Sequence, residues 1–175
     1  MTFDPKQWHD FFIMVGGSAA ALTGLVFVAM TLNLAAITRD ATHLHRAIGT
    51  MTGFVAIFMV CALALMGDQT DVAIGIEWLV VMSAATAVYV YGYVRAIRSH
   101  GSATGLTPLR LVLGTGFYVV GIVGAAILAA GQGLGAYVAA VAMVGLVGFV
   151  ISGAWLLIVG VRGDITGGPA GLPGG

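Results

Sequence analysis

The chain has 175 residues, of which 59% are hydrophobic and only 8% are charged, and its formal net charge is zero. A typical soluble domain carries about 25% charged residues, so this surface cannot be solvated in the way that a soluble domain's surface is. The balanced charge gives no reason to expect nucleic acid as a partner. The composition instead predicts an integral membrane protein whose outer surface contacts lipid.

The first predicted helix starts at Pro5 and extends to Ile37, and after its first two turns it is almost entirely apolar. Asp4 is a favourable N-cap residue, and proline is favourable at the first helical position. At about 1.5 Å per residue the helix would be about 50 Å long, which exceeds the roughly 30 Å hydrocarbon core of a bilayer. We therefore expect residues 8–37 to cross the membrane, with Trp8 in the interface.

Four further apolar stretches are each long enough to cross a bilayer. They cover residues 47–66, 76–94, 109–130 and 136–159, and they are separated by a polar loop, an acidic loop, a basic loop and a short turn. The tail, residues 163–175, has no hydrophobic periodicity, so we expect it to be disordered. The predicted fold is an all-α transmembrane domain, residues 1–162, that forms an antiparallel bundle of five helices.

The charged residues predict how this bundle is oriented. With five spans, one side of the membrane receives six of the seven basic residues: Arg39, Arg46, Arg95, Arg98, Arg110 and Arg162. The other side receives Lys6 and five acidic residues: Asp4, Asp10, Asp68, Asp71 and Glu77. The positive-inside rule then places the N-terminus outside and the C-terminus in the cytoplasm.

Small residues form stripes along the predicted helices at spacings that let two helix backbones approach closely. The members of these stripes are Gly16, Ala20, Gly24, Gly49, Gly53, Gly121, Gly145 and Gly148. Packing within one protomer and homo-oligomerisation both account for such stripes. For any single stripe we favour packing within the protomer, because these motifs are frequent in glycine-rich spans.

The spans carry no charged residue at mid-membrane depth, which argues against a proton-coupled carrier and against an intramembrane protease. We therefore expect no enzymatic activity and no cofactor. Polar groups that could line a path are Thr23, Thr31, Asn33, Thr52 and Ser152. Hydrogen bonds to their own helices or to neighbouring helices are the simpler role for these side chains.

Charged and titratable groups near the membrane surfaces suggest two further sites. Asp10, Asp68, Asp71 and Glu77 form a possible outer cation rim, although a solvated acidic surface is the simpler interpretation. His43 and His45 are weak evidence for metal binding, and we predict no metal site. Arginines of the basic loop, Arg110 included, are expected to anchor the topology by contacting anionic headgroups.

The first helix resembles that of small, uncharacterised bacterial integral membrane proteins. The resemblance is carried by the motif WHDFF at Trp8–Phe12 and by GGSAAALTGLVFVA at Gly16–Ala29. It implies a multi-pass protein of the bacterial cytoplasmic (inner) membrane and transfers no site residue. For function we expect a homo-oligomeric channel or passive pore. The alternative is a non-conducting accessory or scaffold subunit that packs against another membrane protein. Membrane lipids are partners in either case.

Overall fold

The computed structural model describes residues 5–39, 41–100 and 108–166, and this part of the chain is helical without any strand. Its helices are α1 (Pro5–Leu32), α2 (Leu34–Arg39), α3 (Ala41–Ala64), α4 (Asp71–His100), α5 (Pro108–Ala129) and α6 (Leu134–Thr166). Five of them, all except the short α2, are long and apolar enough to cross a membrane. The predicted all-helical architecture with five candidate spans is therefore confirmed.

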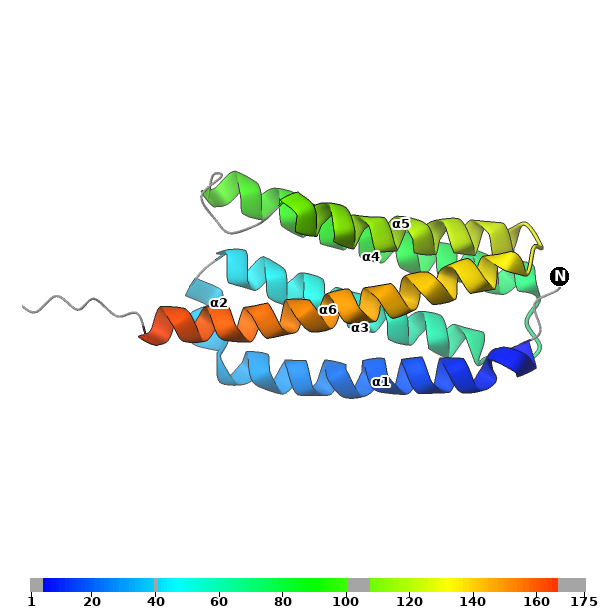
Figure 1. The fold of residues 1–175 in the computed structure, drawn as a ribbon, viewed down its shortest axis with the longest axis horizontal. Helices are drawn as coiled ribbons and strands as arrows, with labels where there is room; N and C mark the ends of the chain where they lie inside the picture. Colours follow the sequence, from blue (N-terminus) through cyan, green and yellow to red (C-terminus); the bar gives the residue numbers. More distant parts are fainter. Residues whose placement is uncertain (1–4, 40, 101–107, 167–175) are drawn as a thin grey trace, which may run out of the picture.

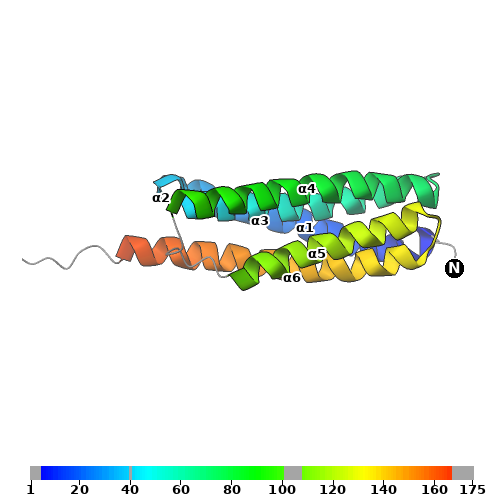
Figure 2. The same ribbon diagram turned by 90° about the horizontal axis from the view of Figure 1, so that it is seen from above.

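The long helices other than α1 form two layers (Figures 1 and 2). One layer contains α3 and α4 and the other contains α5 and α6, and α1 runs obliquely beside them from the α3/α4 layer toward the α5/α6 layer. α3 packs against α1, α4 and α6, and its candidate span is 50% buried, the largest share of any helix. α1 packs mainly on α3. The bundle is thus built around α3, and α1 lies at its margin.

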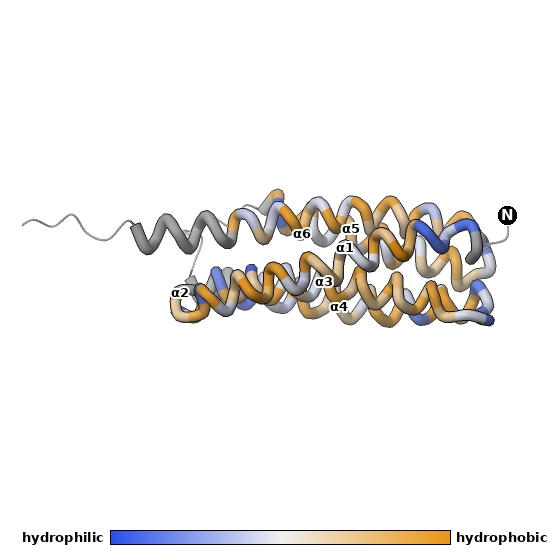
Figure 3. The backbone as a smooth tube through the Cα atoms, turned by 90° about the horizontal axis from the view of Figure 1, so that it is seen from below, coloured by the Kyte–Doolittle hydropathy of each residue, from blue (hydrophilic) through white to orange (hydrophobic). Residues whose placement is uncertain are grey.

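The bundle has two ends, which differ in the helices that begin there (Figure 1). We call the end where α1, α4 and α6 begin the Trp8 end. We call the end where α3 and α5 begin the α2 end, because α2 crosses there from α1 to α3. Figure 3 shows that hydrophilic residues gather near these two ends and that the helices between them are mainly hydrophobic.

Aromatic side chains join the layers near the Trp8 end. The ring of Trp8 packs edge-on against Tyr137 of α6, with 4.7 Å between ring centroids, and it also stacks on Phe12. Phe12 packs in turn against Trp78 of α4. Trp78 is 1% exposed, and its indole N–H donates to the carbonyl of Val60 at 3.0 Å. Trp78 therefore belongs to the core.

The first helix is shorter than the sequence predicts, because it ends at Leu32 rather than Ile37. At Asn33 the backbone N–H bonds to the carbonyl of Met30, and the side-chain amide donates to the carbonyl of Ala29 at 2.9 Å. These bonds satisfy carbonyls that a helix end leaves without a partner. The Asn33 carbonyl then accepts the N–H of Ile37 within the next turn, so the chain continues directly into α2.

Other helix ends extend into the predicted loops. α3 begins at Ala41, so His43, His45 and Arg46 lie on a helix rather than in a polar loop. α4 begins at Asp71, where the hydroxyl of Thr70 accepts the N–H of Ala73 at 3.2 Å and caps the helix. The predicted acidic loop is shortened accordingly.

The C-terminal helix also runs past its predicted end. α6 continues to Thr166, so residues 163–166 are helical and are not part of a disordered tail. Residues 167–175, the rest of the predicted tail, lie outside the described residues.

The α5–α6 hairpin turns at Gly131, which has φ +77°. The N–H of Gly131 bonds to the carbonyl of Leu128, and the N–H of Gln132 bonds to the carbonyl of Ile127. This pair of bonds is the Schellman motif, which closes a helix with a left-handed residue that is usually glycine. Beyond the turn the two backbones approach closely, since a Cβ on Gly124 would lie 2.6 Å from the backbone nitrogen of Ala139.

Candidate functional site

The polar residues that could line a path do not gather in one place. Four of them bond to their own helices: Thr23 to the carbonyl of Ala19, Thr31 to Val28, Asn33 to Ala29 and Ser152 to Phe149. Thr52 instead lines an apolar groove of about 470 Å³ between α3 and α4. Within the described residues these side chains therefore form no common polar path through a single protomer.

The small-residue stripes fall into two groups in the structure. The glycines of the first group lie against a neighbouring helix: Gly16 against Cys61, Gly49 against Tyr89, Gly53 against Val150, Gly121 against Met82 and Gly145 against Phe117. Ala20, Gly24 and Gly148 form the second group and are exposed within the protomer. On α1, therefore, α3 packs against Gly16, whereas Ala20 and Gly24 have no helix of the protomer beside them.

The exposed side of α1 carries a regular series of residues. Asp10, Gly17, Gly24 and Thr31 are all exposed and recur at every seventh position. A Cβ added to Gly17 or Gly24 would meet nothing within 4 Å. We call these four residues the α1 outer face. In the sequence the adjacent glycines Gly16 and Gly17 can each belong to a stripe, and only the docking of α3 decides which one faces outward.

The proposed acidic rim is dispersed at the Trp8 end. Asp10 and Asp68 are exposed, and Asp71 and Glu77 are partly buried. The carboxylate of Glu77 accepts hydrogen bonds from the side-chain amide of Gln69 at 3.0 and 3.1 Å. Among the residues that the structure describes, no three His, Cys, Asp or Glu side chains lie close enough together to hold a metal ion.

The two histidines of α3 are directed to different surroundings. His43 is buried, whereas His45 lines a cavity near the α2 end. Residues two positions apart do not share a helix face, because each residue advances the helix by about 100°. The pair is therefore not arranged as a chelating site.

That cavity has a volume of about 50 Å³ and lies between α3, α4, α5 and α6. Its described lining comprises His45, Arg46, Gly49, Thr50, Tyr89, Tyr93, Arg110, Tyr118, Phe149, Val150 and Gly153. We call it the Arg110 cavity. A cavity needs roughly 10–15 Å³ of such volume for one water molecule, so this one has room for about three to five waters or one small ion.

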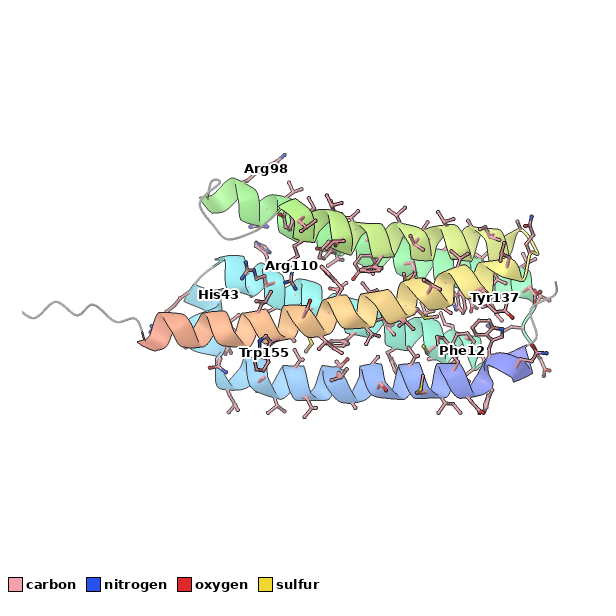
Figure 4. All side chains as sticks on the ribbon, viewed as in Figure 1. Phe12, His43, Arg98, Arg110, Tyr137 and Trp155 are labelled. Carbon is pink, nitrogen blue, oxygen red and sulfur yellow. The ribbon has the colours of Figure 1, made fainter. Side chains whose placement is uncertain are left out.

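Arg110 is held in this cavity by contacts from two helices. The centre of its guanidinium lies 5.1 Å from the centroid of the Phe149 ring, within cation–π range. The hydroxyl of Tyr89 donates to the backbone carbonyl of Arg110 at 3.3 Å. Figure 4 shows Arg110 directed toward the interior of the bundle, whereas Arg98 extends away from it.

Two glycines leave room for the Arg110 side chain and for the aromatic rings beside it. A Cβ on Gly153 would lie 2.7 Å from a guanidinium nitrogen of Arg110 and 3.2 Å from the hydroxyl of Thr50. A Cβ on Gly114 would overlap the hydroxyl of Tyr89 and would lie 2.7 Å from the ring of Phe149. Both glycines therefore admit the arginine and the aromatic rings that surround it.

No pattern in the sequence predicts this cavity. The sequence pattern assigns Arg110 to a basic loop that touches headgroups, but the structure places Arg110 in the first turn of α5 beside the partly buried rings of Tyr89 and Phe149. The sequence carries only a weak signal for this site, because its arginines, tyrosines and glycines are spread over four separate helices. Comparison of the chain with protein-family models, with curated proteins and with solved structures gives no match.

Proposed function

We propose that this chain is a multi-pass membrane protein that assembles with copies of itself through the α1 outer face, and that the assembly forms a passive pore. The observation that carries the proposal is the series Asp10, Gly17, Gly24 and Thr31, exposed on one side of α1. α1 packs mainly on α3, so this side is open to a second copy.

A repeat of seven residues is the spacing at which α-helices wind around one another. An α-helix drifts by about 20° per seven residues, and a left-handed supercoil compensates for the drift. Small residues at the contact let the backbones approach, which favours association where lipid gives no hydrophobic driving force. Copies of α1 arranged around a symmetry axis would then present the four residues of the outer face to that axis.

The axis between protomers is a better place for a path than the interior of one protomer. The interior is filled by large side chains such as Phe54, Ile57 and Leu146, each with 0% of its surface exposed. On the axis, Asp10 would form a ring at the Trp8 end and Thr31 a ring at the α2 end. Rings of carboxylates favour cations, so the expected permeant species is a small cation.

A specific observation also supports the alternative of a non-conducting accessory or scaffold subunit. Gly17 and Gly24 occupy the middle of the α1 outer face and have no Cβ. Two α1 helices, or α1 and a helix of another membrane protein, could therefore meet so closely that no path remains between them. In that case the same face serves assembly alone.

The proposed orientation has the Trp8 end outside a bacterial cytoplasmic membrane and the α2 end in the cytoplasm. The support is the position of the basic residues, because Arg39, Arg95 and Arg98 are exposed at the α2 end. The positive-inside rule associates such residues with the cytoplasm.

The oligomeric state of Gly24→Leu tests the assembly. The purified protein is expected to form a discrete oligomer in detergent, and Gly24→Leu is expected to shift it to the monomer, because the new side chain holds the backbones apart. Gly116→Leu is the matched control, since Gly116 is an exposed helical glycine with nothing within 4 Å of an added Cβ. A monomeric parent protein, or equal effects of the two substitutions, would reject assembly through α1.

Cation flux into liposomes separates the pore from the accessory subunit. If the assembly conducts, Asp10→Asn is expected to lower cation flux and Thr31→Val is expected to change it, while Gly116→Leu leaves it unchanged. A stable oligomer in silent liposomes would leave the accessory role as the function.

A further inference from the structure

We propose that the Arg110 cavity binds an oxyanion of the phosphate class, either as free phosphate or as the headgroup phosphate of an anionic lipid. This site is separate from the α1 outer face, and the proposal does not depend on whether the protein conducts. It rests on the charge of the cavity, on the way Arg110 is held, and on the donors around it.

Arg110 brings a positive charge to the cavity, and none of the described lining residues is acidic. Arg110 is partly buried beside the Phe149 ring, and removing part of a charge from water costs free energy unless an opposite charge or good hydrogen bonds compensate. The described contacts of the Arg110 guanidinium are an aromatic ring and a glycine, which supply no negative charge. A bound anion would supply it.

Arg110 is also positioned before any ligand arrives. The Phe149 ring lies beside the guanidinium, the Tyr89 hydroxyl bonds to the Arg110 backbone, and Gly153 borders the guanidinium nitrogen. A side chain that is already held in place loses less conformational entropy on binding. An arginine that served only as a topology anchor would instead extend into the headgroup region, as Arg98 extends away from the bundle in Figure 4.

The remaining lining provides donors suited to several oxygen atoms. The hydroxyl of Thr50 lies next to the guanidinium, since both border the position that a Gly153 Cβ would take. Tyr118 of α5 also lines the cavity, and its hydroxyl lies next to Gly53 of α3. Arginine recognises phosphate and carboxylate through paired N–H donors, and Arg110 with the hydroxyls of Thr50 and Tyr118 offers more donors than the two oxygens of a carboxylate require. We therefore favour a phosphate over a carboxylate.

The size of the cavity agrees with this class of ligand. A volume of about 50 Å³ accepts a single small anion but not an organic molecule of drug size, whose pockets are about 300–1,000 Å³. The cavity lies near the α2 end of the bundle, where lipid headgroups would lie if the helices cross a bilayer. A headgroup phosphate and a free phosphate are thus two sources of the same chemistry.

The test uses the full chain in phosphatidylcholine nanodiscs, with the thermal unfolding midpoint as the readout. Inorganic phosphate is titrated in one arm, and phosphatidylglycerol replaces part of the lipid in the other. We expect at least one arm to raise the midpoint of the parent protein. Arg110→Gln is expected to weaken the apparent affinity for the probe, read from the concentration that raises the midpoint, roughly tenfold or more. This is the size expected for a lost hydrogen bond between charged groups. Arg98→Gln, which removes an exposed arginine at the same end, is the matched control.

Gly153→Ala tests the geometry with every charge retained, because its Cβ would displace the guanidinium. It is expected to weaken binding as Arg110→Gln does, and it keeps the proposal testable if Arg110→Gln fails to fold. A response to phosphate alone identifies the soluble source, and a response to phosphatidylglycerol alone identifies the lipid. The proposal is overturned if neither probe raises the midpoint, if Arg110→Gln and Gly153→Ala respond as the parent and the Arg98→Gln control do, or if acetate binds as tightly as phosphate.

Discussion

Hydroxyl and amide side chains of this protein mainly complete the hydrogen bonding of the helices that carry them. Thr23 and Ser152 donate to carbonyls three or four residues earlier in their own helices. In a low-dielectric interior an unbonded polar group is costly, so a nearby carbonyl is an effective partner. Polar residues in the apolar spans therefore do not by themselves mark a path for solutes.

At the residue scale, we expect Gly16→Ala to destabilise the fold. The added Cβ would lie 2.8 Å from the Cβ of Cys61, an atom that cannot move away without shifting α3. Overpacking of this kind costs roughly 1–3 kcal/mol, which exceeds the gain of at most about 1 kcal/mol in helix propensity. Thermal unfolding in detergent, followed by circular dichroism, measures the difference.

Gly116→Ala provides the comparison for that substitution. Nothing lies within 4 Å of the Cβ that it adds, so only the gain in helix propensity applies and the midpoint should stay equal or rise. Equal midpoints for Gly16→Ala and Gly116→Ala would contradict the close contact between α1 and α3.

The small-residue stripes show how far sequence reasoning reaches at this scale. Periodicity identifies Gly16, Ala20 and Gly24 as one side of a helix. It does not reveal that α3 covers Gly16 while Ala20 and Gly24 stay exposed. That difference depends on how α3 crosses α1, which is a property of tertiary packing and not of either helix alone.

At the element scale, helix ends were the least predictable feature, because side chains decide them locally. The apolar composition of residues 34–37 is compatible with a continuing first helix, and the sequence analysis predicted one. In the structure the Asn33 amide takes the carbonyl of Ala29 and the chain turns into α2. Apolar length correctly predicted how many helices could cross a membrane, since that property sums over about 20 residues.

The turn between α5 and α6 gives the prediction at this scale. Gly131 has φ +77°, a left-handed conformation that costs a residue with a Cβ roughly 1–2 kcal/mol. We therefore expect Gly131→Ala to lower the free energy of unfolding by about that amount. Gly131→Asn should cost less, because asparagine adopts this conformation more readily. Equilibrium unfolding in detergent measures both variants, and equal losses would contradict the Schellman motif.

At the scale of the whole molecule, the antiparallel bundle predicts which residues share a side of the membrane. Thr38 of α2 and Thr70 before α4 are both exposed and lie at opposite ends. Neither carries charge, so replacing them with cysteine leaves the basic residues that set the orientation unchanged.

A membrane-impermeant thiol reagent applied to intact cells should therefore label Thr70→Cys, and it should label Thr38→Cys only after the membrane is opened. The native Cys61 is 1% exposed and should contribute little. Labelling of both positions in intact cells would contradict a bundle that spans the membrane, and the reverse pattern would invert the proposed orientation.

The Arg110 cavity can form only late in the synthesis and folding of the chain. Its walls come from α3, α4, α5 and α6, and Phe149 and Gly153 belong to the last of these. The cavity cannot exist until α6 has docked, although Arg46 and Tyr89 are translated much earlier. Until then Arg110 lacks the Phe149 ring and Gly153 beside its guanidinium. Closure of the cavity is thus a late step in biogenesis, and an anion bound there would stabilise only chains that have finished folding.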